Sequence, residues 1–205
     1  MKDANTAIIL AGGQSMRMGF DKQFLKIGDQ WIIDRLLEQL KGIFQEIIIV
    51  TNKPQSYANY SCNIVKDEID GFGPLGGIHA GLKHAASAFN YVIACDMPYI
   101  NTDYILYMKN LLETCEGNVE AVITRYGEWI EPFNSFYGKS LIHKIEEKVI
   151  CDDKRIFALL KEVEVLYIEE KTARKYSPNW EMFMNLNKQE DYQQFLKVNG
   201  HGYDK

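Results

Sequence analysis

The chain has 205 residues, 46% of them hydrophobic and 25% charged, which is the composition of a globular protein that buries its own core. Its formal net charge of −5 argues against nucleic-acid binding, which needs a basic excess to neutralise phosphates. No apolar run approaches the roughly 18 residues of a membrane span and the start MKDANT is unlike a signal peptide, so we expect a cytoplasmic protein without membrane partners.

Short apolar runs alternate with amphipathic segments through the first half of the chain. We predict strands over residues 6–10, 46–51, 62–67 and 91–96. We predict helices over residues 31–44, 74–89 and 102–115, the last of them capped by Thr102. Consecutive strands that are apolar on both faces favour parallel pairing between helices. This order therefore predicts an α/β protein with three α/β/α layers around a mostly parallel central sheet.

The second half of the chain alternates less regularly. Its predicted strands span residues 119–125, 131–138 and 163–169. Its predicted helices span residues 140–150, 155–163 and 188–200. Neither a linker nor a repeat interrupts the chain, so we expect a single domain over residues 1–205.

The first predicted strand leads into the segment AIILAGGQSMRMGFDK, residues 7–22. In open parallel sheets, ligands bind beyond the carboxyl ends of the strands. Gly12 and Gly13 let the backbone approach a phosphate closely, and Arg17 and Lys22 supply the positive charge that a triphosphate attracts. The spacing fits neither the GxGxxG fingerprint nor the P-loop motif. A flexible loop with solvated charges stays open as the alternative.

Two later segments place useful chemical groups at the ends of predicted elements. Asp96 follows the apolar run YVIAC, and a lone carboxylate at a strand end suits Mg²⁺, which binds one or two carboxylates plus phosphate oxygens and water. Gly76 and Gly77 open a predicted helix, where N–H groups can face an anion or a base edge. A turn aspartate and a purely structural glycine turn are the alternatives.

At these segments the chain resembles a known family. LAGGQSMRMGFDK, residues 10–22, matches the LAGGxSxRMGxDK signature of nucleotidyltransferases, and is most similar to that of the molybdenum cofactor guanylyltransferases (MobA). GPLGGIHAGL at 73–82 and CDMPYI at 95–100 follow in the order of that family. MNLNKQEDY at 184–192 resembles its NxNTPED-like segment, with Lys and Gln in place of Thr and Pro.

The resemblance is close from Ile8 to about Asn101 and weak from there to the region of Asn185. It implies a Rossmann-like nucleotidyltransferase fold. It also implies a nucleotide-binding half over about residues 1–101 and an acceptor half, which binds a pterin, over about residues 102–205.

The same resemblance implies roles for single residues. The implied catalytic residues are Arg17, Lys22 and Asp96, of which Asp96 would bind Mg²⁺. The implied nucleotide- and substrate-binding residues are Leu10, Ala11, Gly12, Gly13, Lys22, Asn52, Asp67, Leu75, Gly76, Gly77, Asn185 and Asn187. Leu75 would pack on the guanine ring, and the last two asparagines would lie near the pterin or the metal. In an extended segment, their alternation with apolar residues would put both asparagines on one face.

The acceptor half offers further candidates. Lys154 and Arg155 suit a pterin phosphate, or belong to a solvated helix face. Four aromatic residues either line a pterin pocket or pack in the core: Trp129, Phe133, Phe136 and Tyr137.

The implied reaction transfers GMP from GTP to the molybdopterin-bound molybdenum cofactor, which releases pyrophosphate and forms a guanine dinucleotide cofactor. Because the acceptor phosphate is already anionic, catalysis should consist of positioning and electrostatic stabilisation. A cytidylyltransferase of the same cofactor and a sugar-phosphate nucleotidyltransferase are alternatives, as is a non-catalytic GTP-binding carrier module. The implied partners are GTP, the molybdenum cofactor and other proteins of its biosynthesis.

Overall fold

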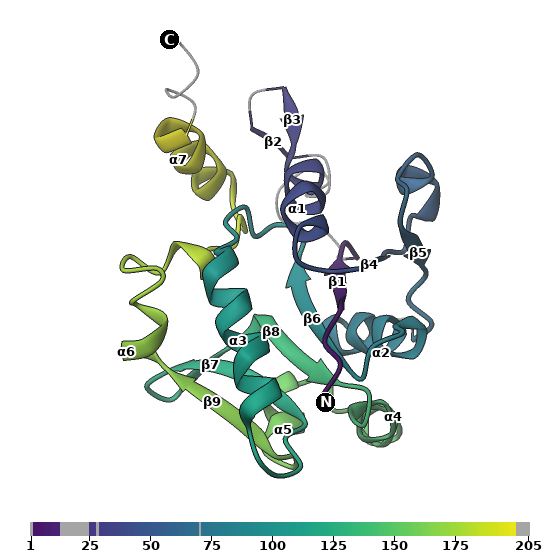
Figure 1. Cartoon of the computed structure of the whole chain (residues 1–205). Helices are drawn as coiled ribbons and strands as arrows, with labels where there is room; N and C mark the ends of the chain where they lie inside the picture. The colour runs from purple at the N-terminus through teal and green to yellow at the C-terminus, as the bar shows by residue number, and fades with distance from the viewer. Residues whose placement is uncertain (1, 13–24, 28, 70, 200–205) are drawn as a thin grey trace.

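The computed structural model describes residues 2–12, 25–27, 29–69 and 71–199. Within these ranges, seven strands form one sheet in the order β5-β4-β1-β6-β8-β7-β9 (Figure 1). The strands of its first part are β1 (Thr6–Leu10), β4 (Glu46–Val50), β5 (Asn63–Val65) and β6 (Phe89–Ala94). They pair in parallel, with Ile8 of β1 opposite Ile48 on one side and Val92 on the other.

The second part of the sheet mixes strand directions. Its strands are β7 (Ala121–Tyr126), β8 (Trp129–Gly138) and β9 (Val165–Glu169). β8 runs antiparallel to both β6 and β7, whereas β9 is parallel to β7. The connection from β7 to β8 is only Gly127 and Glu128, and so short a connection joins antiparallel strands alone. The sheet as a whole is mostly parallel, which confirms the prediction.

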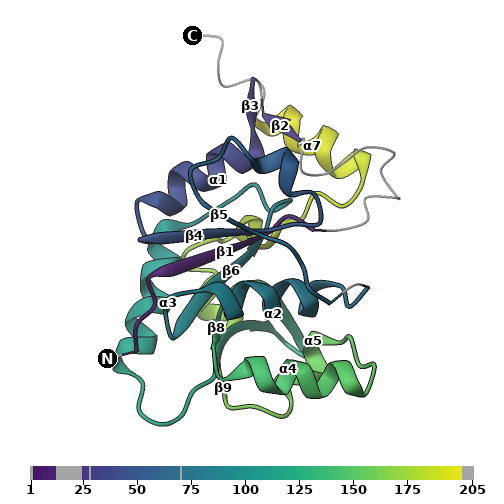
Figure 2. The same ribbon diagram turned by 90° about the vertical axis from the view of Figure 1, so that its right-hand side faces the viewer.

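Helices cover both faces of the sheet (Figure 2). The helices on one face are α1 (Ile32–Lys41) and α3 (Thr102–Thr114), and those on the other are α2 (Pro74–His84), α4 (Leu141–Ile150) and α5 (Ile156–Leu160). Ile8 and Ile9 show why β1 is apolar throughout. Both are fully buried, and they belong to the cores on opposite faces. The three α/β/α layers confirm the predicted fold class.

The sequence missed several short elements. β2 (Lys26–Ile27) and β3 (Gln30–Trp31) form a separate two-stranded sheet, which contacts α7 (Gln189–Asn199) through Tyr192 (Figure 2). The other short elements are the 3₁₀ helices η2 (Pro54–Tyr57) and η3 (Glu181–Phe183) and the helix α6 (Glu170–Ala173). Among the described helices, none combines the length and the apolar character needed to cross a membrane.

Two predicted details of the helices are wrong. The helix predicted over residues 74–89 ends at His84, because the chain from Phe89 onward enters β6 and pairs with β1. The cap of α3 is Asn101 and not Thr102. The Asn101 side chain accepts the Tyr104 N–H at 2.9 Å, and Thr102 is already the first residue of the helix. Both residues suit a cap, and only the backbone conformation selects between them.

Candidate functional site

The carboxyl ends of the four parallel strands meet at one edge of the sheet. The Ala11 N–H donates to the Val50 carbonyl at 2.8 Å, and the Cys95 N–H donates to the Leu10 carbonyl at 3.0 Å. An equivalent bond joins the ends of β4 and β5. These bonds continue the parallel pairing one residue beyond the strands, so the loops that follow begin side by side.

Gly12 and Asn52 lie next to each other beyond β1 and β4, and both are exposed. A Cβ atom on Gly12 would lie 3.9 Å from the backbone N and from Nδ2 of Asn52. Thr51 Oγ1 donates to the Ala11 carbonyl at 3.2 Å, which holds the two loops together. Leu10 and Ala11 are buried. A ligand at this edge therefore meets the β1 loop first at Gly12.

Asp67 follows β5 and lies against the first turn of α2. Its Oδ1 accepts the Ile69 N–H at 3.0 Å. A Cβ atom on Gly76 would lie 2.8 Å from Oδ1 and 3.0 Å from Oδ2 of Asp67, closer than Cβ atoms pack in proteins. The Asp67 carboxylate can occupy this place only because residue 76 has no side chain.

The other predicted residues of α2 face the core. Leu75 is fully buried in the cluster that includes Ile8. Gly77 is also buried, and a Cβ atom on it would lie 3.1 Å from Cδ2 of Leu10. Leu75 and Gly77 therefore set how closely α2 packs on β1. This packing places the start of α2 at the carboxyl edge of the sheet.

Asp96 follows β6 and is 9% exposed. Its carbonyl accepts the Leu186 N–H at 3.0 Å, which brings residues 182–187, the asparagine segment, against the carboxyl edge. Asn185 is half-buried and Asn187 is exposed. The Asn187 N–H donates to the Asn185 carbonyl at 3.0 Å, so the chain bends between the two asparagines. The expectation of an extended segment is therefore wrong.

The groups around Asp96 fit a divalent cation that is shared with a bound substrate. Mg²⁺ commonly uses a single protein carboxylate together with phosphate oxygens and water. The amide oxygens of Asn185 and Asn187 are further hard donors on the neighbouring segment. Among the described residues, no group of three or more His, Cys, Asp or Glu side chains forms a complete metal site. A cation at Asp96 would therefore depend on substrate phosphates for most of its ligands.

Three predicted residues lie outside the described residues: Gly13, Arg17 and Lys22. After this gap, Leu25 is buried in the core and Lys26 lies in β2. The Tyr192 hydroxyl of α7 accepts the Lys26 N–H at 3.3 Å and donates to the Lys26 carbonyl at 2.7 Å. Sequence reasoning assigned no role to Tyr192, although this residue ends the quoted segment MNLNKQEDY, because a tyrosine in a polar helix indicates no partner by itself.

Lys154 and Arg155, the candidates for binding a pterin phosphate, each form an ion pair with an acidic neighbour. Lys154 Nζ lies 3.6 Å from Oδ1 of Asp152, and Arg155 Nε lies 2.8 Å from Oδ1 of Asp153. The hydrogen bond from Arg155 lowers the pKa of Asp153 to about 2. Lys154 Nζ also lies 6.0 Å from the centre of the Phe72 ring, so this pair of cations is near the start of α2.

The aromatic candidates of the acceptor half differ in their surroundings. Phe136 and Tyr137 are fully buried in the cores on opposite faces of the sheet, and Phe133 is half-buried against both. Trp129 is 77% exposed at the turn between β7 and β8. Two of the four residues are therefore core residues, as the alternative interpretation held.

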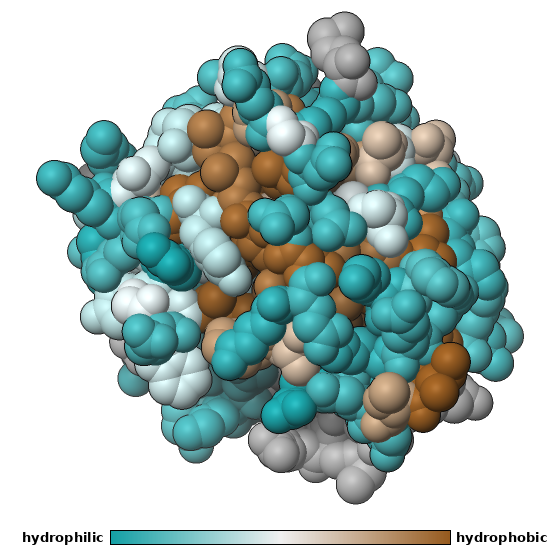
Figure 3. Space-filling model, turned by 90° about the horizontal axis from the view of Figure 1, so that it is seen from below, coloured by the Kyte–Doolittle hydropathy of each residue, from teal (hydrophilic) through white to brown (hydrophobic). Residues whose placement is uncertain are grey.

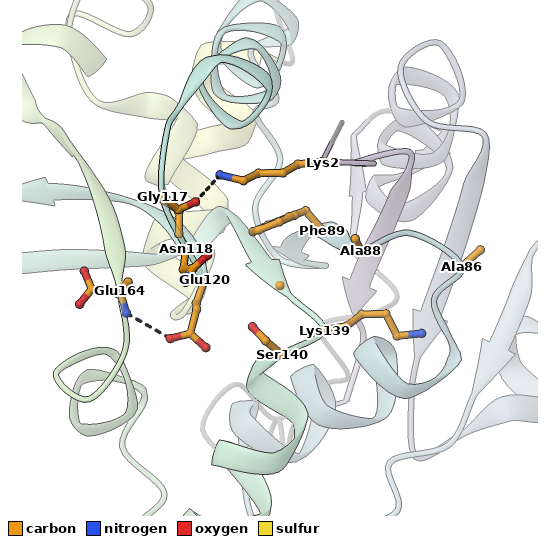
Figure 4. Close-up of a pocket in the computed structure, with 12 residues that line it drawn as sticks. Lys2, Ala86, Ala88, Phe89, Gly117, Asn118, Glu120, Lys139, Ser140 and Glu164 are labelled. Atoms are coloured by element: carbon orange, nitrogen blue, oxygen red, sulfur yellow. Dashed lines mark hydrogen bonds between the residues drawn. The ribbon is translucent and has the colours of Figure 1, made fainter.

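A pocket of about 820 Å³ lies at the opposite end of the sheet, near the amino ends of the strands (Figure 4). Lys2 Nζ donates to the Gly117 carbonyl at 3.1 Å and Lys139 Nζ to the Ala85 carbonyl at 2.7 Å, so both lysines bond to protein carbonyls. Apolar residues gather in the middle of this face, with hydrophilic residues around them (Figure 3). Of the described residues that line the pocket, none belongs to the predicted site.

Known proteins are similar to this chain in sequence and in fold. The family described as MobA-like NTP transferase domain matches residues 7–166. A probable molybdenum cofactor guanylyltransferase of Peptoclostridium acidaminophilum is 50% identical over 196 residues, which cover 94% of this chain and 89% of the relative. The molybdenum cofactor guanylyltransferase of Syntrophotalea carbinolica is 47% identical over 192 residues, 94% of this chain and 90% of the relative.

A solved structure has the same fold at lower sequence identity. It is that of molybdopterin-guanine dinucleotide biosynthesis protein A from Archaeoglobus fulgidus. It matches with a TM-score of 0.82 and 23% identity, over 94% of this chain and 97% of that one. At this identity the likeness concerns the fold alone.

Proposed function

Because the chain belongs to the family of MobA-like NTP transferase domains, and within it to the molybdenum cofactor guanylyltransferases, we propose that it transfers GMP from GTP to the molybdopterin-bound molybdenum cofactor and releases pyrophosphate. It is a nucleotidyltransferase, as its sequence predicts. The observation that carries the proposal is the bond from Leu186 to the Asp96 carbonyl. This bond joins the carboxyl edge to the asparagine segment, so that donor and acceptor can meet at one carboxylate.

In this proposal the donor GTP lies along the carboxyl edge. Gly12 would let the backbone approach the triphosphate, and Arg17 and Lys22 would neutralise its charge. The Asp67 carboxylate, held beside Gly76, would accept N–H groups of the guanine base. Guanine presents two neighbouring N–H donors on one edge, which suit a carboxylate.

Asp96 would hold Mg²⁺ together with the phosphates of the donor. When bound, the ion would supply charge neutralisation and act as a Lewis acid. The backbone around Asp96 is fixed on both sides, since the Met97 N–H donates to the Ala94 carbonyl at 3.1 Å and Leu186 bonds to Asp96 itself. The backbone that carries this carboxylate is therefore held in place before any substrate binds.

The acceptor phosphate needs no general base, because it is an anion at neutral pH. Its oxygen would form a new bond to the α-phosphorus of GTP, and the bond to the β-phosphate would break, its electron pair leaving with pyrophosphate. Asn185 and Asn187 would orient the acceptor, while Arg17 and Lys22 would stabilise the leaving group. We expect this reaction in the cytoplasm, where other proteins of cofactor biosynthesis would supply the acceptor.

Nucleotide selectivity tests the proposal. The Tm of the purified protein is measured with GTP, CTP and UTP, each with and without Mg²⁺, because a ligand that binds the native state raises its stability. GTP with Mg²⁺ should raise the Tm most, and pyrophosphate release should require both GTP and the molybdopterin acceptor. Stabilisation by CTP and not GTP would indicate the cytidylyltransferase. GTP binding without pyrophosphate release would indicate the carrier module. Either result contradicts the proposal.

A further inference from the structure

The asparagine segment is also held at a second point, deeper in the sheet. Asn134 of β8 is 1% exposed, and its Nδ2 donates to the Met182 carbonyl at 3.2 Å. Its Oδ1 accepts the Tyr91 hydroxyl at 2.7 Å. Tyr91 is fully buried in β6, the strand that ends shortly before Asp96. One amide group therefore links β6 to the beginning of the segment whose Leu186 bonds to Asp96.

Asn134 lies at a break in the regular sheet. Pairing between β6 and β8 ends at Val92 opposite Ser135, and the register between β7 and β8 shifts between Val122 and Thr124. The φ angle of Asn134 is +58°, in the left-handed region that asparagine adopts more readily than most other residues with a side chain. Irregularities of this kind turn a side chain in a new direction and are frequent beside active sites.

Two other polar side chains of β8 bond within the strand. Ser135 Oγ donates to the Glu131 carbonyl at 2.8 Å, and the Tyr137 hydroxyl donates to the Pro132 carbonyl at 2.7 Å. These two hydrogen bonds therefore stabilise the irregular part of β8, the bulge, from within the strand. The Asn134 amide instead connects the bulge to two other parts of the chain, β6 and the asparagine segment.

We infer that Asn134 is a positioning residue, which sets the place of the asparagine segment relative to Asp96. The inference rests on the proposed function, which assigns this segment to the acceptor and the metal. The segment is bonded at both ends, by Met182 to Asn134 and by Leu186 to Asp96. Loss of the first bond should loosen the acceptor side of the site. The nucleotide side, which follows β1, β4 and β5, should keep its geometry.

Three variants separate positioning from simple stability. Asn134→Gly keeps the left-handed backbone and removes the amide. Tyr91→Phe removes only the bond to Oδ1 and leaves the bond to Met182. Thr6→Val is the matched control, because it removes a buried hydroxyl that bonds to Glu46 at 2.8 Å, at the amino end of β1 and away from the carboxyl edge.

Hydrogen exchange of residues 182–187 and steady-state kinetics are measured for each variant. Asn134→Gly should speed exchange in this segment and raise the KM for the molybdopterin acceptor about 10-fold, the size of effect expected when a group that orients a site is removed. The KM for GTP should not change. Tyr91→Phe should have a smaller effect in the same direction. Thr6→Val should lower the Tm without changing the exchange of the segment or the KM for the acceptor.

Two results would overturn the inference: unchanged exchange of the segment in Asn134→Gly, or an unchanged KM for the acceptor. If the unmodified protein transfers no GMP, the proposed function has failed. The exchange measurement then still decides whether Asn134 holds the segment.

Discussion

The two parts of the central sheet supply their candidate site residues in different ways. In the parallel part, four candidates are each the second residue after a strand: Gly12 after Leu10, Asn52 after Val50, Asp67 after Val65 and Asp96 after Ala94. In the part formed by β8, β7 and β9, the candidates Asn185 and Asn187 follow no strand. They lie on the asparagine segment, which starts within η3 and is held by Asp96 and Asn134.

Strand direction explains this difference. Parallel strands in register end at the same edge, so a residue just beyond any of them reaches the same site. β8 runs the other way, and its last residue, Gly138, lies in the lining of the pocket at the amino end. The side of the carboxyl edge that we propose for the acceptor is therefore built by a later part of the chain. It depends on hydrogen bonds between distant residues.

The largest effect on activity should come from substitution of Asp96, which follows a parallel strand and also holds the asparagine segment. Asp96→Asn keeps the size of the side chain and removes its charge. The rate of pyrophosphate release at saturating GTP should fall about 10²–10³-fold, as when an electrostatic contact to the reacting groups is lost. The Tm should stay close to that of the unmodified protein. Asp153→Asn, at a half-buried carboxylate bonded to Arg155, is the control and should leave the rate unchanged.

A substitution in α2 tests the parallel part by itself. Gly76→Ala would put a Cβ atom 2.8 Å from Oδ1 of Asp67, so the carboxylate must move. GTP should then bind about 10-fold more weakly, the loss of roughly one charge-assisted hydrogen bond. Isothermal titration with GTP measures the change.

Gly81→Ala is the matched control on the same helix. Its Cβ atom would lie 2.6 Å from Cγ2 of Ile8, inside the core. It should lower the free energy of unfolding by about 1–3 kcal/mol and leave GTP affinity of the folded protein unchanged. Equal losses of affinity in the two variants would show that Gly76 acts through general packing and not through Asp67.

Tyr192→Phe tests the link between α7, late in the chain, and β2, which precedes the parallel strand β4. It removes both bonds to the Lys26 backbone, close to the return of the loop that carries Lys22. Unfolding free energy should fall by about 1 kcal/mol, and turnover should fall several-fold because Lys26, four residues after Lys22 in the chain, loses both bonds to α7. Tyr60→Phe removes a hydroxyl that bonds to Asp34 at 2.7 Å and should affect the Tm alone. A similar drop in turnover for both variants would contradict the role of Tyr192.

The smallest effect concerns the pH dependence of stability in the acceptor half. Burial raises the pKa of Glu131 above its ordinary 4.5, while the hydrogen bond from Trp180 Nε1, at 2.9 Å, opposes this. The folded state therefore holds its proton to a higher pH than the unfolded state does. Stability falls as the pH rises from 4.5 through the raised pKa, and the penalty is complete above it.

Glu131→Gln keeps an acceptor for Trp180 and removes the charge. Its Tm at pH 7 should exceed that of the unmodified protein, and the two Tm values should converge well below pH 4.5. Thermal melts across this pH range provide the measurement. A Tm difference that stays constant with pH would exclude ionisation of Glu131 as its cause.

Much of the parallel part follows from local patterns. Runs such as TAIIL and EIIIV predict strands that are buried on both faces, and Ile8 and Ile9 do face opposite cores. Asp96 could be picked out because it directly follows such a run, YVIAC, whereas only the family resemblance implied a role for Asp67. The cap of α3 could not be predicted from the sequence, since Asn101 and Thr102 are both suitable residues and only the backbone conformation selects one.

The sequence by itself determined the alternation of strands and helices, the layers that result and the loops that reach the carboxyl edge, because each depends on neighbouring residues and on the two-residue period of a strand. Only the tertiary structure decided the closeness of Asp67 to Gly76, the contact of the asparagine segment with Asp96 and the link through Asn134. The last two join residues far apart in the chain, and the first depends on how α2 packs against the sheet. They form only when the whole sheet and its helices have packed, so no local pattern contains them.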